Sequence, residues 1–247
     1  MQSRVHLLGI PIDPVTAKGA LARLQGFLQK EGGNHVLTPN SEMLVAAHRN
    51  PEFKSVLQGS ALNLPDSAGL LLMARFTRQK LPARVTGVDT VQLLCSSLSA
   101  EHRVFLLGAG EGIAERAAEE LKKCNPSLTI AGTCACNPDA SIEEDICERI
   151  RASGAHILLV AYGAPQQDLW IARNLRYLPN IRLAVGVGGT FDFLAGDKKR
   201  APSFLRRIGL EWLWRLILEP RRIGRIFTAV VVFPALVLLH GKNTPKG

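Results

Sequence analysis

The stretch that decides the fold is residues 104–112, VFLLGAGEG, in which four apolar residues run directly into a glycine-rich turn. A buried strand that ends in glycine and leads into a helix is typical of a parallel sheet. Helical periodicity follows the turn over Gly112–Lys123. The segment therefore predicts one strand–turn–helix unit of an α/β domain.

The same alternation continues in both directions along the chain. Further apolar runs lie at Val5–Ile10, His35–Thr38, Leu128–Ile130, Ile157–Ala161 and Leu183–Val187. Helical stretches lie between them, at Lys18–Lys30, Ser41–Arg49, Ser67–Phe76, Asp89–Leu98, Ile142–Ala152 and Gln166–Leu175. This pattern predicts a doubly wound, Rossmann-like α/β domain with a mostly parallel sheet. Such sheets bind ligands beyond the carboxyl ends of their strands, so functional residues are expected in the loops there.

Charge divides the chain into two parts near residue 197. Residues 198–247 contain eleven Lys and Arg but only two acids, Glu211 and Glu219, whereas residues 1–197 contain equal numbers of acidic and basic residues. We therefore predict an α/β domain over residues 1–197 and a basic helical appendage over residues 198–247. So basic a segment is expected to meet an anionic partner, which is phosphate, anionic lipid or nucleic acid.

The appendage ends in an uncharged stretch, Ile226–Leu239, that is interrupted by Pro234. Because a spanning helix needs about 20 apolar residues, we expect this stretch to be too short to cross a bilayer. A basic helix beside an apolar stretch is typical of an interfacial membrane contact, and packing on the core or on another subunit is the alternative. No nucleic-acid-binding motif accompanies Trp212 and Trp214, so no nucleic-acid partner is expected.

Five cysteines are scattered along the chain, at positions 95, 124, 134, 136 and 147. An odd number without a C-x-x-C pair does not indicate a disulfide framework, and no His or further Cys stands at metal-ligand spacing from Cys134 and Cys136. We expect most of the cysteines to be small buried apolar residues. The N-terminal residues lack the long apolar segment of a signal peptide, so a reducing, cytoplasmic location is expected.

Glycine-rich turns follow three of the predicted strands. Backbone N–H groups in the turn that contains Gly108 and Gly110 can approach a phosphate, but Ile113 stands where a dinucleotide fingerprint needs its third glycine. The turns YGAPQQD (162–168) and VGGTFD (187–192) add the candidates Gly163, Gln167, Gly188, Gly189 and Asp192. Together these turns are candidates for a nucleotide cradle. Ordinary turns, with Asp192 as a helix cap, are the alternative.

Three short polar side chains end two other apolar segments: Thr38 and Asn40 in TPN, and Asp66 in LPD. An aspartate at such a place can serve as general base for a hydroxyl group, and capping the helix over Ser67–Phe76 is the alternative. The chain shows no flanking pair of carboxylates of the kind that a glycoside hydrolase uses. It also contains no D-x-D sequence, so no metal clamp on a diphosphate is expected.

Arginines of the appendage are the charges available to neutralise a diphosphate instead. The spacing of Arg215, Arg222 and Arg225 places them on one face of a helix, provided that the helix continues past Pro220. Guanidinium groups match phosphate oxygens in geometry and charge. A solvated or lipid-facing basic stripe is the alternative.

Eight short segments follow one another in a characteristic order: TPNSEML, LPDSAGL, RVTGVD, VFLLGAGEG, YGAPQQD, VGVGGTFDFLAG, KRAP and GLEWLWRLILEPRR. Together they resemble the WecG/TagA/CpsF glycosyltransferases, glycosyltransferase family 26. Members transfer N-acetylmannosamine or its uronic acid from a UDP-sugar to undecaprenyl-diphosphate-linked N-acetylglucosamine, for teichoic acid and other surface polysaccharides. The resemblance implies an inverting, metal-independent transferase without a cofactor, peripheral on the cytoplasmic face of the cell membrane.

The resemblance also implies roles for single residues. Asp66 would be the catalytic base, Thr38 and Asn40 would line the sugar site, and Arg84 lies in the family's R-V-x-G segment. Residues that match other family motifs are Gln167, Asp192 and the appendage arginines Arg215, Arg222 and Arg225. In the family, the appendage completes the active site and associates with the membrane.

This chain departs from the family pattern at two places. Asp66 is followed by Ser67 where many members have glycine, and residues 166–168 are Gln-Gln-Asp instead of Lys-Gln-Glu. The aspartate and the central glutamine are kept, so we still expect the family's activity. The departures leave the sugar preference open.

Two other classes stay open on the sequence. A nucleotide-binding oxidoreductase is disfavoured by the missing third glycine, and a titration of nicotinamide fluorescence distinguishes it. A non-catalytic, nucleotide-binding membrane assembly factor is the second alternative, and hydrolysis of a sugar nucleotide would count against it. The exact sugar, the exact acceptor and the formation of a homo-oligomer are likewise open.

Overall fold

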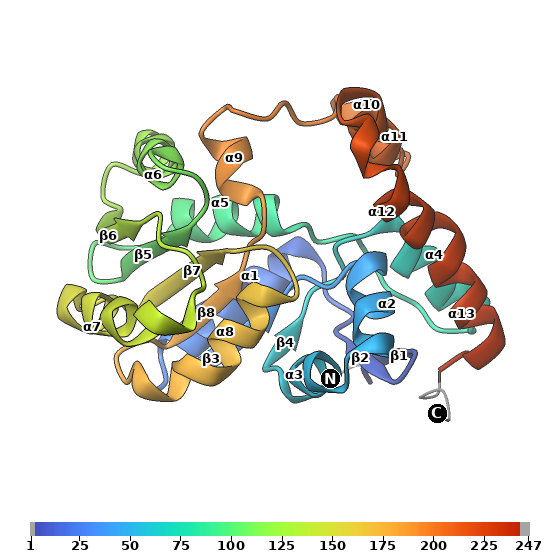
Figure 1. The fold of residues 1–247 in the computed structure, drawn as a ribbon, viewed down its shortest axis with the longest axis horizontal. Coiled ribbons are helices and arrows are strands. Elements are labelled where there is room, and N and C mark those ends of the chain that lie inside the picture. Colours follow the sequence, from blue (N-terminus) through green and yellow to red (C-terminus); the bar gives the residue numbers. More distant parts are fainter. Residues whose placement is uncertain (1–2, 243–247) are drawn as a thin grey trace.

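The computed structural model describes residues 3–242, and a six-stranded sheet lies at their centre (Figure 1). Its strands are β3 (Asn34–Leu37), β4 (Leu62–Asn63), β5 (Arg103–Gly108), β6 (Thr129–Cys134), β7 (Ile157–Ala161) and β8 (Leu183–Gly186). Their order is β4-β3-β8-β7-β5-β6, and every pairing is parallel. All six carboxyl ends therefore open at one edge, and the predicted α/β sheet is confirmed.

Helices cover both faces of the sheet, because successive side chains of a strand point to opposite sides. In β5, Leu106 packs into one apolar layer while Phe105 and Leu107 pack into the other. The first layer contains α1 (Ala17–Leu28), α5 (Gly87–Ser97), α6 (Ile113–Cys124) and α9 (Thr190–Leu194). The second contains α7 (Glu143–Ser153) and α8 (Gln166–Asn174). Burial on both faces explains why these strands read as continuous apolar runs.

The N-terminal apolar run takes a form that its pattern did not predict. Residues 5–12 make an antiparallel hairpin of β1 (Val5–Leu7) and β2 (Ile10–Ile12), apart from the main sheet. The chain reverses at Leu8 and Gly9, whose φ angles of 53° and 76° suit a tight hairpin turn. The expectation of a parallel strand at Val5–Ile10 is therefore wrong. The sixth strand of the sheet is instead β4 at one edge, which is too short to show a periodicity.

A third apolar cluster lies beside the sheet. It joins the hairpin to α2 (Ser41–Arg49), α3 (Pro51–Gly59) and α4 (Ala68–Phe76). Phe233 and Val237 of α13 (Phe233–His240) are buried in the same cluster. Part of the appendage is thus built into the core of the domain.

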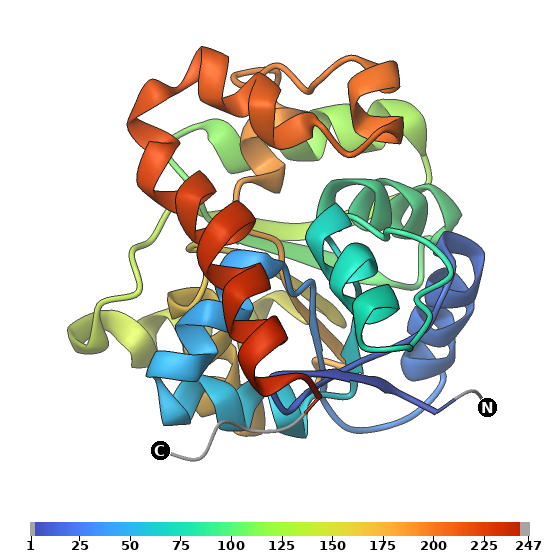
Figure 2. The same ribbon diagram turned by 90° about the vertical axis from the view of Figure 1, so that its right-hand side faces the viewer.

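The appendage runs along one side of the domain, past α2 and α4 (Figure 2). It consists of α10 (Ser203–Arg207), α11 (Glu211–Leu218), a 3-10 turn (Pro220–Arg222), α12 (Ile223–Phe227), a π-helical turn (Thr228–Val232) and α13. Residues 243–247 of the predicted appendage lie outside the described residues. The proposed division between residues 197 and 198 stays a prediction.

The apolar part of the appendage is longer than the sequence led us to expect. Helical structure continues from Pro220 to His240, over 21 residues, and the most apolar window has a mean hydropathy of 2.0. Pro234 lies at the start of α13, just after the π-helical turn at Thr228–Val232, and the helix continues through it to His240. The expectation of a segment too short to cross a bilayer is therefore wrong: length and composition would allow it. The burial of Phe233 and Val237 favours a helix that lies on the domain.

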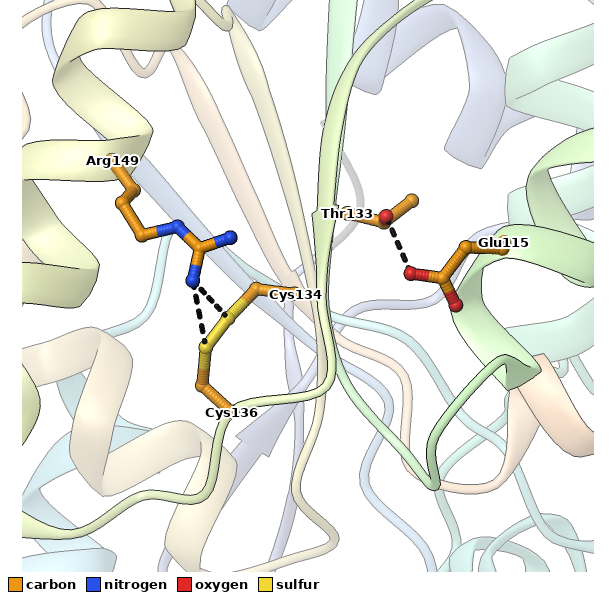
Figure 3. The surroundings of a disulfide bond; sticks show 5 residues. All are labelled: Glu115, Thr133, Cys134, Cys136 and Arg149. Carbon is orange, nitrogen blue, oxygen red and sulfur yellow. Dashed lines mark hydrogen bonds between the residues drawn. A yellow bond between two sulfur atoms is a disulfide. The ribbon is translucent and has the colours of Figure 1, made fainter.

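The cysteines follow the expectation in part. Cys95, Cys134 and Cys147 are buried, whereas Cys124 is exposed. Cys134 and Cys136 are joined by a disulfide beside Arg149, which lies 3.5 and 3.7 Å from the two sulfur atoms (Figure 3). This pairing was not expected from the sequence. It closes a ring of neighbouring residues and restricts the unfolded chain very little, so it is no fold-stabilising framework.

Candidate active site

The pairing of β3 with β4 brings Thr38, Asn40 and Asp66 onto neighbouring loops. The backbone N–H of Asp66 donates to the carbonyl of Pro39 at 3.0 Å, so the loops that follow the two strands run side by side. Thr38 is buried, and its hydroxyl donates to the carbonyl of Gly186 at the end of β8, at 3.4 Å. The structure thus assembles these three predicted residues at one place.

The two helices that begin beside Asp66, α2 and α4, are capped by other side chains. The hydroxyl of Ser67 accepts a hydrogen bond from the N–H of Leu70 (3.3 Å) and caps α4. Asn40 caps α2 by accepting from the N–H of Met43 at 3.0 Å. The alternative that Asp66 serves as a helix cap is therefore wrong, and its carboxylate is left for another role.

Asp66 is partly buried and has an unusual acidity. Burial, which removes water from the carboxylate, raises its pKa to about 7, and the charge of Glu211 adds to this effect. A hydrogen bond from the N–H of Gly87 (3.3 Å) and the charges of Arg84 and Arg215 oppose the shift. A carboxylate with a pKa near neutrality combines a useful ionised fraction with enough basicity to accept a proton.

Arg84 and Arg215 meet beside Asp66 although they come from different parts of the chain. The carboxylate of Glu211, the first residue of α11, accepts from both: 3.0 Å to Nη2 of Arg84 and 3.0 Å to Nη2 of Arg215. The Arg215 guanidinium also lies over the ring of Phe193, 5.1 Å from its centre. The appendage therefore contributes charge directly to the surroundings of Asp66.

The remaining two candidate arginines do not share a helix face with Arg215. The chain leaves the helical conformation at Glu219, after α11, so Arg222 lies in the following 3-10 turn and Arg225 in α12. Nε of Arg222 is 2.6 Å from Glu219, and Nε of Arg225 is 2.6 Å from Glu42 in the first turn of α2. The expectation of one continuous arginine face is wrong, because Pro220 begins a new turn.

Gln167 connects two of the glycine-rich turns. It is buried, and its side-chain Oε1 accepts from the N–H groups of Gly163 (3.1 Å) and Gly188 (2.8 Å). The turns after β7 and β8 are thereby held against each other, as expected for neighbouring strands. This contact gives Gln167 a structural role in the cradle, which the sequence motif alone does not reveal.

The turn after β5 lies next to that pair. The N–H of Ala109 donates to the carbonyl of Ala161 at the end of β7, at 3.3 Å. Gly108 has a φ of 93°, and a Cβ atom there would lie 2.8 Å from the ring of Tyr162, so only glycine fits. Gly110 lies in the same turn, before α6. The glycine-rich turns of β5, β7 and β8 thus form one surface at the carboxyl edge of the sheet.

Asp192 belongs to α9 and not to its cap. Gly189 occupies the capping position without a side-chain bond, and Asp192 pairs with Lys198 at 3.4 Å. The capping alternative for Asp192 is therefore wrong. This ion pair fastens the beginning of the appendage to the helix that follows the Gly188–Gly189 turn.

Two contributors to the site were missed in the sequence. Glu211 could have been noticed as one of only two acids in a basic segment, four residues before Arg215. Asp168 is fully buried with His35 at 3.6 Å, and burial raises its pKa while His35 lowers it. No sequence signal connects these two residues, because β3 and α8 meet only in the fold. Within residues 3–242, no cluster of three or more His, Cys, Asp or Glu is arranged to hold a metal ion.

Comparison with known proteins gives a consistent result. The family model "Glycosyl transferase WecG/TagA/CpsF family" matches residues 5–247. The chain is 31% identical over 223 residues to the N-acetylglucosaminyldiphosphoundecaprenol N-acetyl-beta-D-mannosaminyltransferase of Bacillus spizizenii, covering 89% of this chain and 84% of that protein. Enzymes of the same name from Bacillus subtilis (31% identity; 88% and 84% covered) and Staphylococcus aureus (25%; 91% and 88%) are similar along nearly the same length.

Proposed function

This chain belongs to the WecG/TagA/CpsF glycosyltransferase family, and on that premise we propose which reaction it catalyses and how. The reaction is transfer of N-acetylmannosamine, its uronic acid or a related hexosyl group from a UDP-sugar to undecaprenyl-diphosphate-linked N-acetylglucosamine. The names of the similar enzymes support the acceptor and the N-acetylmannosaminyl group. The UDP donor follows from the family to which the chain belongs.

Asp66 is the proposed catalytic base, and its environment is the observation that carries the proposal. Its carboxylate takes the proton from an acceptor hydroxyl as that oxygen attacks the anomeric carbon. The bond from the anomeric carbon to the diphosphate breaks on the opposite face, so UDP leaves and the configuration inverts. The pKa of about 7 supports this role, as does its position at the carboxyl end of the sheet. Thr38 and Asn40, on the adjoining loops, line the sugar site.

The donor is proposed to lie over the glycine-rich turns. Backbone N–H groups around Gly108, Gly110 and the Gly188–Gly189 turn can approach a diphosphate without obstruction by side chains. Gln167 holds the Gly163 and Gly188 turns together, which supports a cradle of fixed shape. Asp192 lies at the rim of this surface, next to Lys198.

Arginines are proposed to offset the negative charge that grows on the leaving diphosphate. Arg84 and Arg215 are the best placed, since both act on the charge of Asp66. Arg222 and Arg225 extend the positive charge along the appendage toward α2. Fixed cations stabilise developing charge in the way that a bound metal does elsewhere, so no metal is needed for this step.

Membrane association is proposed for the appendage. Its exposed apolar side chains include Ile217, Ile223, Phe227 and Leu238, each half exposed or more. Arg221 and Arg225 accompany them, and a surface of this composition suits the interface of an anionic bilayer. The enzyme would then lie on the inner face of the membrane, where a polyprenyl acceptor can reach Asp66.

The direct test is a transfer assay with the full-length protein, a set of UDP-sugars and a short-chain lipid-diphosphate-linked N-acetylglucosamine. We expect a disaccharide product with UDP-N-acetylmannosamine or its uronic acid, and at least about 10²-fold less product from the Asp66→Asn variant at the same enzyme concentration and time. UDP binding without transfer from any donor would instead favour the non-catalytic assembly factor.

A further inference from the structure

Glu211 is a charged residue for which the proposed reaction has no direct use. It is the first residue of α11, and only 14% of its side chain is exposed. A carboxylate so far removed from water needs compensation, which Arg84 and Arg215 supply. Oε2 accepts a hydrogen bond from Arg84, and Oε1 accepts one from Arg215. Glu211 therefore joins a core arginine to an appendage arginine.

The segment that carries Arg84 is itself fixed to the loop of Asp66. The N–H of Val85 donates to the carbonyl of Pro65 at 2.8 Å, and the N–H of Gly87 donates to the Asp66 carboxylate at 3.3 Å. The backbone on either side of the base is thus held, whereas the Arg84 side chain depends on Glu211 for its direction. The same holds for Arg215, whose other contact is the ring of Phe193.

The ion pairs farther along the appendage, at Arg222 and Arg225, do not have this character. The carboxylate of Glu219, paired with Arg222, is 40% exposed, and the guanidinium of Arg225, paired with Glu42, is 60% exposed. Exposed pairs of this kind contribute little to stability. Among these bridges, only the one through Glu211 includes two of the cations that act on Asp66.

We propose that Glu211 is a positioning residue of this transferase, whose carboxylate holds Arg84 and Arg215 at the edge of the Asp66 site. The inference rests on the proposed function, since it assigns Glu211 to the same reaction. Each arginine commits only its Nη2 to Glu211, so the other N–H groups of both guanidinium ions are left to face a diphosphate. Glu211 itself contacts no reacting atom.

The groups that act on Asp66 make this role measurable. Arg84 comes from the loop before α5, Arg215 and Glu211 come from α11, and the N–H of Gly87 begins α5. Glu211 raises the pKa of Asp66, whereas the two arginines and the amide lower it. If the neutral side chain of Glu211→Gln releases both arginines, two charges that lower the pKa of Asp66 are lost together with one that raises it, so this pKa should rise and the base should ionise at higher pH. If Glu211 only stabilised the fold, the arginines would stay in place, and loss of its own charge alone would lower the pKa.

The test compares full-length wild type with the variants Glu211→Gln and Glu211→Asp. Glu144→Gln is the control, because Glu144 is an exposed carboxylate on α7 that also pairs with an arginine, Arg151. Transfer from the best donor of the panel is measured against pH, and UDP affinity is measured by calorimetry. For Glu211→Gln we expect kcat to fall about 10- to 100-fold, as for misplaced catalytic groups, with the acid limb of kcat/KM at higher pH because the arginines have moved away. Glu144→Gln should match wild type.

Glu211→Asp keeps the charge but shortens the reach, so it should lose several-fold in kcat and keep the wild-type pH limb. This variant decides the matter if Glu211→Gln does not fold, as judged by thermal melting and UDP binding. Wild-type kcat in either variant, or a lower rate with the acid limb at unchanged or lower pH in Glu211→Gln, would overturn the inference while the proposed function stands. Absence of transfer by wild type itself would remove both.

Discussion

The sheet and the appendage are held in place by different interactions. Strands β5, β7 and β8 are covered on both faces by apolar side chains with almost no exposure. In contrast, α11 and α12 have no buried residue, and ion pairs connect them to the domain. Only further along, at Phe233 and Val237, does the appendage enter the apolar core.

This difference separates the two components of the candidate site. The sheet fixes Asp66, Thr38 and the glycine-rich turns, because the ends of neighbouring parallel strands cannot move independently. The arginines are placed by charge, and charge interactions at an accessible surface weaken with salt and depend on docking. The proposed catalytic base in the core of the domain is thus combined with cations on a more adaptable segment.

The largest effect is expected in the rigid component. Asp66→Asn keeps the size of the side chain and an acceptor for the Gly87 amide, but it cannot accept a proton. Turnover should therefore fall by about 10²–10⁴, the usual contribution of a positioned base, with UDP affinity unchanged. Steady-state transfer rates and UDP calorimetry check this, with the exposed Asp145→Asn on α7 as control. Near wild-type turnover would show that Asp66 has only a structural role.

The second effect belongs to the appendage. Replacing Arg215, Arg222 and Arg225 together by Ala should lower transfer to a detergent-soluble acceptor by about 10²-fold, comparable to the loss of one donor to a developing anion. Vesicle binding should weaken only modestly, because the exposed apolar side chains of α12 and α13 remain. Sedimentation with anionic liposomes is measured beside the transfer rate. Full transfer with lost vesicle binding would make these arginines a lipid anchor instead.

A smaller effect concerns stability. The pKa of Asp66 is about 7 in the folded protein against an ordinary 3.8, so the folded state holds a proton that the unfolded state releases as the pH rises. Ionising Asp66 in the folded protein therefore lowers the free energy of unfolding. This loss of stability is absent below pH 3.8, grows between pH 3.8 and about 7, and is complete above about 7. Asp66→Asn removes it, so its melting temperature should exceed that of wild type at pH 8, by about 2–4 °C per kcal/mol recovered.

The difference in melting temperature should nearly vanish at about pH 3, below both pKa values, where Asp66 is protonated in both states of wild type. Scanning calorimetry at the two pH values checks this. A variant that melts below wild type at pH 8 would mean that burial does not dominate the environment of Asp66.

The smallest expected effect is that of chelation. In the proposed reaction, the arginines supply the positive charge that a metal would otherwise bring to the diphosphate. Transfer should therefore stay at its initial rate in excess EDTA, measured in the same assay. Loss of activity that Mg²⁺ or Mn²⁺ restores would show that the cations near Asp66 are not sufficient.

The two regions also differ in how far the sequence predicts them. Burial on both faces makes β5, β7 and β8 readable as apolar runs, and the parallel order places their glycine-rich turns together. Val5–Ile10 shows the limit, since a hairpin turn at Leu8 and Gly9 leaves the same apolar composition as a strand. The edge strand β4 has only two residues and therefore no period.

Tertiary contacts decide what local patterns cannot. Asp66 looks like a helix cap until Ser67 is seen to take that position. Pro220 and Pro234 look alike as helix breakers, yet one begins a new turn and the other is accommodated. The bridge from Arg84 to Glu211 spans more than half of the chain. The excess of Lys and Arg over acids identifies the appendage in the sequence, but it does not show which of its residues lie beside Asp66.

The central claim is that Asp66 acts as a base with a pKa near neutrality, and the pH dependence of kcat/KM tests it most directly. Full-length wild type and Asp66→Asn are assayed between about pH 5 and 9 with the donor that gives transfer. We predict a wild-type rate that rises with pH to a plateau above about 7, and a residual Asp66→Asn rate without that rise. An acid limb near pH 7 in both proteins, or in neither at equal rates, would contradict the assignment.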